Sequence, residues 1–325
     1  MWKHYRQINI CLERKNDLKI MIRCLIVDLL RKFKYFLKPR HIYFTPQVSG
    51  KFVAVWILGG VGNQLFQFAT AYALSRETGF QLILHRNFKG YFRDEELRNL
   101  GIEFVDWNGT QPSMNKHDIQ YAPYNIFMEK DFSYDSKIWN IADSCYLYGY
   151  WSSPKYFQKY KSEILELISF EKILNNRIYD LSKHISELNS VSLHLRRGDY
   201  NTPEGIVSFG LLDIDYYERA RDLILRSVPN AIFFIFSDDV VIAKSLFQNW
   251  GNCIFVGPNS SLEDLYLMTL AQNHVIANST FSWWGAYLSK NSDGIKIAPR
   301  HWFTKEATIR HKYLLDLFPD DWIQL

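Results

Sequence analysis

Short apolar runs alternate with amphipathic segments from residue 52 to the C-terminus. The apolar runs have the length of buried strands and lie at Phe52–Leu58, Phe80–Leu84, Cys145–Gly149, Val191–Leu195, Ala231–Phe236, Cys253–Val256, His274–Ala277 and Ile295–Ala298. Helical spacing of apolar positions predicts helices over 64–78, 155–169, 215–227, 240–249, 261–272 and 282–290. Strands that alternate with helices in this way indicate parallel sheets covered by helices. The stretch 86–144 is less regular, and its elements are not predicted.

The first 50 residues have a different pattern. Apolar positions recur at helical spacing between Ile22 and Leu37, and basic residues outnumber acidic ones. No stretch approaches the roughly 18 uncharged apolar residues that a membrane span needs, and charges interrupt any signal-peptide core. A basic amphipathic helix can lie on an anionic membrane surface, so we expect residues 1–45 to make a peripheral membrane contact. The alternative is a helix that packs on the main body, and Pro39 and Pro46 mark the linker that follows.

Composition is that of an ordinary globular protein. The 325 residues are 47% hydrophobic and 22% charged, with a formal net charge of +4, and this length is comfortable for two domains. The small charge and the lack of a basic-aromatic module argue against nucleic acid as a partner. The four cysteines, Cys11, Cys24, Cys145 and Cys253, have no CxxC spacing. This scatter fits a reducing compartment and gives no metal site.

The segment Val191–Tyr200 is the most informative stretch of the chain. An apolar strand ends in Arg196 and Arg197, followed by Gly198 and Asp199. Arginine side chains are fork-shaped and permanently charged, which suits phosphate oxygens, and open α/β sheets bind ligands at the carboxyl ends of their strands. Taken alone, the segment could equally be a surface ion pair between Arg197 and Asp199.

Two further segments combine a strand end with a helix start. In the first, Leu58–Ala69, a glycine cluster precedes a helix, so that backbone N–H groups could face a phosphate or a sugar hydroxyl. In the second, Ala277–Tyr287, hydroxyl side chains open a helix and could do the same. The simpler readings are a tight turn with an Asn63-Gln64 cap, and an ordinary N-cap in front of two core tryptophans.

The three segments, in this order, resemble the family of α-1,2-fucosyltransferases. Its members carry a Gly-x-Gly-Asn-Gln-x-Phe-Gln turn, a His-x-Arg-Arg-Gly-Asp-Tyr motif and an Asn-Ser-(Ser/Thr)-Phe-Ser-Trp-Trp-Gly segment. Gly149–Phe157 and Phe236–Asp239 are also similar to the family. The resemblance covers about Phe52 to the C-terminus and leaves out the first 50 residues.

The resemblance implies a GT-B-like α/β fold, with two Rossmann-type halves facing a cleft and the basic helical extension in front. We expect the extension over residues 1–50, an acceptor-side half over 51–185 and a GDP-fucose-binding half over 186–325. The implied enzyme is an inverting galactoside α-1,2-L-fucosyltransferase, which moves L-fucose from GDP-β-L-fucose to O2 of a galactoside-terminated oligosaccharide in a surface glycan such as an O-antigen. No metal and no cofactor are expected. The expected location is cytoplasmic, with a peripheral contact at the inner face of the plasma membrane.

The resemblance also gives the site residues their roles. Arg196 is expected to contact the β-phosphate, Arg197 to share that contact or brace the loop, and Asp199 to order the arginine loop. The expected contacts to GDP-fucose involve His194 beside the base, Asp238 on guanine, Ser279, Thr280 and Phe281 on the phosphates, and Gly60, Gly62 and Asn63 from the opposite half.

Several alternatives stay open. Asp238 and Asp239 could cap the following helix, His194 could be a core histidine, and the Trp283-Trp284 and Tyr150-Trp151 pairs are expected to belong to the core. An inverting transfer needs a base for the acceptor hydroxyl, and Glu204, Asp213 and Asp215 all follow the arginine motif without one standing out. A GDP-sugar transferase of different linkage, or a non-catalytic nucleotide- or glycan-binding protein, would share much of this pattern.

Overall fold

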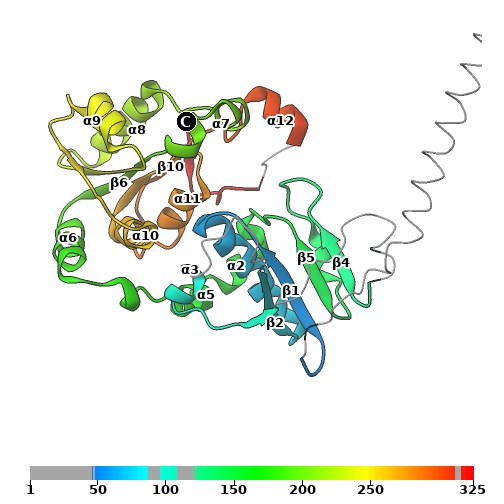
Figure 1. Cartoon of the computed structure of the whole chain (residues 1–325). Helices are drawn as coiled ribbons and strands as arrows, with labels where there is room; N and C mark the ends of the chain where they lie inside the picture. The colour runs from blue at the N-terminus through cyan, green and yellow to red at the C-terminus, as the bar shows by residue number, and fades with distance from the viewer. Residues whose placement is uncertain (1–45, 47, 87–95, 108–118, 120–121, 312–315) are drawn as a thin grey trace, which may run out of the picture. The chain divides into compact units, whose positions relative to one another are not determined.

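The computed structural model describes residues 46, 48–86, 96–107, 119, 122–311 and 316–325 (Figure 1). Residues 1–45, most of the predicted N-terminal extension, lie outside the described residues. Residues 46–111 and 123–325 belong to one compact unit, which holds both sheets. The proposed boundary near residue 185 therefore stays a prediction.

The first sheet is parallel and has the strand order β3-β2-β1-β5-β4. Its strands are β1 (Phe52–Ile57), β2 (Gln81–Arg86), β3 (Val105–Trp107), β4 (Asn125–Met128) and β5 (Cys145–Tyr148). The central strand β1 is almost wholly buried, as its continuous apolar sequence predicts for a strand that is covered on both faces.

The second sheet is also parallel, with the order β11-β10-β9-β6-β7-β8. Its strands are β6 (Ser190–Leu195), β7 (Ile232–Ser237), β8 (Cys253–Phe255), β9 (Asn273–Val275), β10 (Lys296–Ala298) and β11 (Ile323–Gln324). The two parallel sheets with their covering helices confirm the prediction of a GT-B-like fold with two α/β halves (Figure 1).

Helices connect and cover the strands. They are α2 (Val61–Thr78), α3 (Glu96–Asn99), α5 (Lys161–Leu167), α6 (Asn176–Glu187), α7 (Pro203–Ser208), α8 (Ile214–Ser227), α9 (Val240–Phe247), α10 (Ser261–Leu270), α11 (Thr280–Tyr287) and α12 (Lys305–His311). The helix predicted over 155–169 is shorter than expected. Its first part is two 3-10 turns, η2 (Pro154–Tyr156) and η3 (Gln158–Tyr160), and α5 begins only at Lys161.

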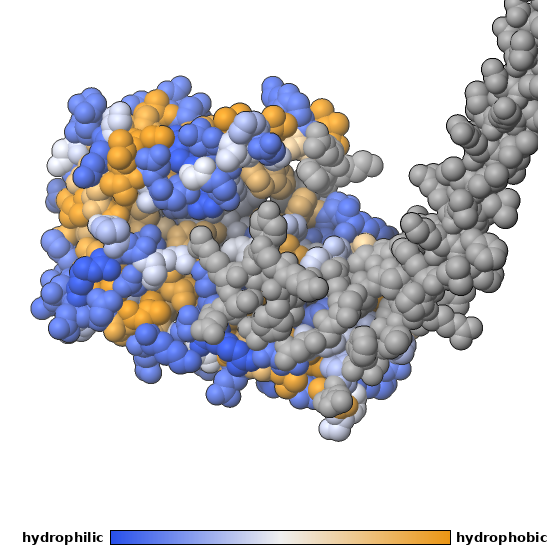
Figure 2. Space-filling model, in the orientation of Figure 1, coloured by the Kyte–Doolittle hydropathy of each residue, from blue (hydrophilic) through white to orange (hydrophobic). Residues whose placement is uncertain are grey.

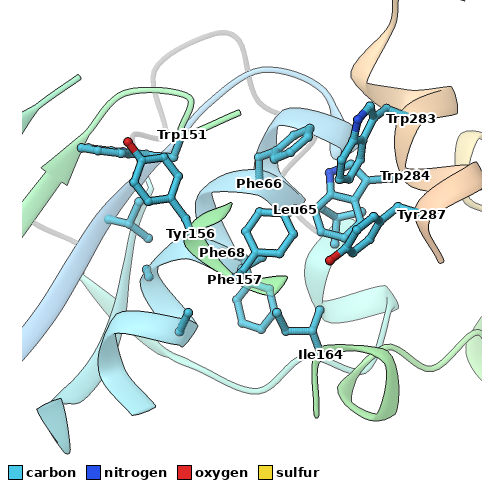
Figure 3. Close-up of a cluster of buried hydrophobic side chains, with 14 of the residues drawn as sticks. Leu65, Phe66, Phe68, Trp151, Tyr156, Phe157, Ile164, Trp283, Trp284 and Tyr287 are labelled. Atoms are coloured by element: carbon cyan, nitrogen blue, oxygen red, sulfur yellow. The ribbon is translucent and has the colours of Figure 1, made fainter. Parts of the chain in front are cut away.

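An aromatic cluster joins α11 of the second half to α2 of the first (Figure 3). The ring of Phe66 on α2 lies 4.4 Å from that of Trp283 and 5.2 Å from that of Trp284, measured between centroids. Phe157 stacks on Trp284 at 5.5 Å. Both tryptophans are fully buried, so the expectation that they belong to the core is confirmed. This packing fixes the start of α11 beside the start of α2.

The face shown in Figure 2 has extensive hydrophilic areas and several separate apolar areas. Val207, Val241 and Ile309 are among the exposed apolar side chains. Within the described residues, none of the helices has the length and apolar character that crossing a membrane requires.

Candidate active site

A pocket of about 910 Å³ lies where the carboxyl ends of strands from both sheets face one another. The first half contributes the turn Gly59–Asn63 after β1, with Phe132, Tyr150 and Ser152. The second half contributes the strand ends after β6, β7 and β8 and the start of α11. This is the edge at which open parallel sheets bind their ligands.

Two helices begin at the pocket without a side-chain cap. The N-cap residues are Gly60 for α2 and Ser279 for α11, and neither makes a side-chain capping hydrogen bond. The hydroxyl of Thr280 instead donates to Oδ1 of Asn63 at 2.8 Å, across the two helix starts. A helix start carries backbone N–H groups without an intrahelical partner and a partial positive charge. Two such starts side by side favour an anion.

Gly62 makes this approach of α2 and α11 possible. A Cβ atom at Gly62 would lie 2.5 Å from the carbonyl carbon of Thr280 and 2.6 Å from the backbone nitrogen of Phe281. Real Cβ atoms do not come so close to backbone, so any larger residue would push the two helix starts apart. The glycine cluster therefore lets the starts of α2 and α11 lie in contact, in addition to forming a turn.

Arg196 directly follows β6 and lines the same pocket as the two helix starts. Its guanidinium bonds Oδ1 of Asp199 at 2.6 Å and Oδ2 of Asp238 at 2.9 Å, and it lies over the ring of Tyr200 at 5.4 Å. About a quarter of the side chain is exposed, and it lines the pocket. Its Nε has no hydrogen-bond partner among the described residues. The arrangement offers a fork-shaped cation to a ligand in the pocket.

Arg197 points away from the pocket and is buried. Its guanidinium donates to the carbonyl oxygens of Arg196 at 3.0 Å and Leu212 at 2.9 Å. A buried guanidinium that holds two backbone carbonyls stabilises the loop. Arg197 was expected either to share the β-phosphate contact or to brace the arginine loop, and this geometry fits the second role.

The neighbouring aspartates have different partners. Asp239 caps α9 by accepting the N–H of Ile242 at 2.9 Å. Asp238 is turned to the arginine loop, where Oδ1 accepts the N–H of Arg197 at 2.8 Å and Oδ2 faces Arg196. Gly198 lies so close to this carboxylate that a Cβ atom there would collide with it. The capping alternative therefore holds for Asp239 and not for Asp238.

His194 lines the pocket as a neutral imidazole. Burial, reinforced by the charge of Arg196, lowers the pKa of His194 to about 3, so the ring carries no charge at neutral pH. Its Nδ1 finds no partner within the described residues, and its ring centroid lies 5.6 Å from that of Phe281. A neutral imidazole beside a flat aromatic ring suits an uncharged planar group better than a phosphate.

Asp264 is a pocket carboxylate that the sequence did not single out. It lies in the first turn of α10 and accepts a hydrogen bond from Asn259 at 2.6 Å. Burial raises the pKa of Asp264 to about 6. In the sequence it follows the capping box Ser260-Ser-Leu-Glu263 and looks like one more acidic residue at a helix start.

The first half supplies a partly aromatic wall. Tyr150 follows β5 and stacks with Phe132 at a centroid distance of 6.1 Å, and both rings line the pocket. Trp151 is buried, as expected for a core residue, whereas Tyr150 is half-buried at the pocket. Flat aromatic faces of this kind can pack against the apolar face of a sugar ring.

None of the three carboxylates considered as a base, Glu204, Asp213 and Asp215, lines the pocket. Asp213 caps α8 by accepting the N–H of Tyr216 at 3.0 Å. Among the described residues, the pocket carboxylates are Asp199, Asp238 and Asp264. In the same part of the chain, no group of three or more His, Cys, Asp and Glu side chains is placed to hold a metal ion.

All of the predicted site residues except Arg197 line this one pocket. They come from the arginine motif, the glycine turn, the Asn-Ser-Thr-Phe segment and the end of β7, which are far apart in the sequence. Two parallel α/β halves with such a pocket at their facing strand ends are the arrangement of a GT-B-like fold.

The chain belongs to glycosyl transferase family 11, whose model matches residues 18–325. It is 33% identical to an alpha-1,2-colitosyltransferase of Escherichia coli, over 84% of this chain and 98% of the relative. It is 30% identical to the O-antigen biosynthesis glycosyltransferase WbnK of Escherichia coli, over 82% of this chain and 98% of the relative. It is also 23% identical to galactoside alpha-(1,2)-fucosyltransferase 2 of Sus scrofa, over 75% of this chain and 72% of the relative.

Proposed function

We propose that the protein transfers L-fucose from GDP-β-L-fucose to O2 of a galactoside, with inversion at the anomeric carbon. The proposal rests on one observation: Arg196 and the uncapped starts of α2 and α11 line the same pocket. A sugar nucleotide leaves as a nucleoside diphosphate, and stabilising the charge that develops on its β-phosphate is the largest demand of the reaction.

The diphosphate would lie between the two helix starts. Backbone N–H groups at Thr280 and Phe281, with the hydroxyl of Ser279, would hold its oxygens, and the hydroxyl of Thr280 could join them by exchanging its bond to Asn63 for one to the phosphate. Arg196 would exchange its bond to the exposed Asp199 for a bond to the β-phosphate while keeping Asp238. Gly60, Gly62 and Asn63 would approach the diphosphate or the fucose from the first half.

Guanine presents two adjacent donors, N1–H and the N2 amino group, which match a carboxylate. The resemblance implied this contact for Asp238, but both of its oxygens already have partners in the arginine loop. Asp264 shares the pocket with His194 and Phe281 and accepts one hydrogen bond, from Asn259. We assign guanine to Asp264, with His194 and Phe281 beside the base.

A second donor is favoured by the 33% identity to an alpha-1,2-colitosyltransferase. Colitose is L-fucose without the hydroxyl at C3, so the GDP derivatives of the two sugars present the same diphosphate to the site. A pocket that hydrogen-bonds the C3 hydroxyl would reject GDP-colitose by a factor on the order of 10⁴, whereas a pocket without that contact would accept both.

Release of GDP tests both donors in one assay. The full chain is incubated with GDP-fucose or GDP-colitose and a panel of β-galactosides, with GDP-mannose as a control donor. We expect acceptor-dependent turnover of GDP-fucose. Turnover of GDP-colitose alone would replace the donor in the proposal, and binding of GDP-fucose without turnover would leave a non-catalytic binding protein.

The guanine assignment has its own test in the Asp264→Asn and Asp238→Asn variants. Asp264→Asn should reduce the preference for GDP over ADP in calorimetric binding, because the carboxylate that reads N1–H and N2 is gone. Asp238→Asn should instead lower turnover through the arginine loop. The reverse result would return guanine to Asp238.

A further inference from the structure

Glu129 is a carboxylate that neither the family motifs nor the proposed reaction uses. It follows β4 directly, and its own N–H donates to the carbonyl of Tyr148 at the end of β5, at 2.9 Å. Burial raises the pKa of Glu129 to about 7, while hydrogen bonds from the backbone N–H groups of Tyr150, Trp151 and Ser152 oppose the rise.

The carboxylate of Glu129 holds the loop after β5. Oε2 accepts the N–H of Tyr150 at 2.7 Å, and Oε1 accepts the N–H of Trp151 at 2.9 Å. Two consecutive N–H groups can converge on one carboxylate because the backbone turns at Trp151, which has a φ of 57°. A positive φ is uncommon for a bulky residue and needs support from its surroundings. Here the support is Glu129 and the burial of the Trp151 side chain.

The loop packs closely against this carboxylate. A Cβ atom at Gly149 would collide with the side chain of Glu129. The amide of Gln67 ties the same loop to β1, donating to the carbonyl of Gly149 at 3.1 Å and accepting the N–H of Leu58 at 3.0 Å. The ends of β1, β4 and β5 are thus fixed together by two side chains.

The loop that Glu129 holds forms the pocket wall of the first half. Tyr150 and Ser152 line the pocket, and Phe132, which stacks on Tyr150, lies beside them. The groups assigned to the diphosphate and the base come mainly from the second half. We propose that Glu129 is a positioning residue that shapes the sugar-acceptor subsite by holding the Tyr150–Ser152 loop, and that it leaves the nucleotide subsite unaffected. This inference rests on the proposed transfer to a galactoside.

The matched pair of variants is Glu129→Gln and Asp131→Asn. Glutamine keeps the size of the side chain, but its NH₂ group faces an N–H donor and one hydrogen bond is lost. Asp131 lies two residues further on and accepts the N–H of Ser133 in a local turn, at 3.0 Å, without lining the pocket. Both substitutions replace a carboxyl group with an amide of the same size in the same segment, so the difference between them reports the contact with the loop.

Three quantities are measured for the wild type and both variants. These are the affinity for GDP by calorimetry, the affinity for a soluble β-galactoside by saturation-transfer NMR with GDP present, and kcat and KM for transfer. We expect Glu129→Gln to weaken galactoside binding and raise the acceptor KM by roughly tenfold, the effect of one hydrogen bond to a charged group. GDP affinity and kcat should stay within about threefold, and Asp131→Asn should resemble the wild type.

An unchanged galactoside affinity in folded Glu129→Gln, or an equal loss of GDP affinity, would overturn the inference. Galactoside binding to a wild type that transfers no fucose would refute the proposed reaction while leaving the Glu129 comparison valid. A wild type that does not bind galactoside would overturn both.

If Glu129→Gln does not fold, the wild type itself provides the test. Protonation of Glu129 would convert one acceptor oxygen into an O–H group, so galactoside affinity should fall below about pH 7 while GDP affinity shows no matching step. The titratable groups that face Glu129 are Asp131, Tyr150 and Tyr156, and burial raises the pKa of both tyrosines further above neutrality. A galactoside affinity that is constant across this pH range would overturn the inference.

Discussion

Replacing Arg196 with alanine should nearly abolish turnover while leaving the protein folded. The guanidinium has two carboxylate partners, Asp199 at 2.6 Å and Asp238 at 2.9 Å, and keeps about a quarter of its side chain exposed. Its loss removes one cation from the place where the β-phosphate would leave. Removal of one such charge-stabilising group costs roughly 3–4 kcal/mol in the transition state, a factor of about 10²–10³ in rate. Because the ion pairs are partly exposed, the fold should lose only about 1 kcal/mol.

Arg221→Ala is the matched control for this substitution. Arg221 also lies over an aromatic ring, that of Trp250 at 5.0 Å, and its side chain is 30% exposed, against 27% for Arg196. It belongs to α8 and does not line the pocket. The control should therefore lose similar packing without losing the phosphate contact.

The assay compares kcat, GDP affinity and thermal midpoint for the wild type and both variants. Arg196→Ala should lower kcat by at least about a hundredfold, and Arg221→Ala should leave it within about threefold. If folded Arg196→Ala turns over at a near-normal rate, or if both variants lose activity equally, the phosphate role of Arg196 is refuted.

Four further predictions concern the loop brace, the metal, the N-terminal segment and the buried carboxyl. Arg197→Lys should lower kcat by less than about tenfold, because the lysine ammonium can still donate to one of the two carbonyl oxygens that Arg197 holds. A loss as large as that of Arg196→Ala would make Arg197 a phosphate ligand. Activity should survive excess EDTA, and complete loss restored by Mn²⁺ or Mg²⁺ would show that a metal is required. A chain that begins at Lys51 should keep its activity on soluble acceptors but lose affinity for anionic vesicles, since each Lys or Arg near such a surface contributes about 1 kcal/mol; equal binding of both forms would exclude a membrane role for residues 1–45. The raised pKa of Glu129 means that the folded state holds a proton between about pH 4.5 and 7 that the unfolded chain has released, so its contribution to stability is full below this window and is lost as pH rises through it. Relative to Glu129→Gln, the wild type should lose roughly 3 kcal/mol across this range in denaturant titrations, and parallel pH curves would contradict the raised pKa.

The sequence predicted the central elements because their signals are local. A continuous apolar run such as β1 or β7 is a buried parallel strand, and each of the eight predicted strands is present. The strands that were missed, β3, β4 and β11, are short and partly exposed at sheet edges. Helices α3, α6, α7 and α12 were missed as well. The buried residues of α6, Ile178, Ser182 and Ile185, recur at helical spacing, so the pattern of this helix was visible in the sequence.

The predicted site residues share one property that the sequence shows, which is their position at the end of a strand or the start of a helix. Asp264 and Glu129 also lie at a helix start and at a strand end, but the sequence did not single them out. Asp264 looks like a helix-start acid, and Glu129 lies in the stretch 86–144 that was not predicted. Their raised pKa values come from burial in the folded chain, which a local sequence pattern does not show.

The anomeric configuration and linkage of the product test the central claim most directly. The full chain is incubated with GDP-β-L-fucose and a soluble β-galactoside, and the product is analysed by NMR. We predict an α-linked L-fucose on O2 of the galactose, formed with inversion from the β-linked donor. A β-linked product, attachment at another hydroxyl, or hydrolysis of the donor without transfer would contradict the account.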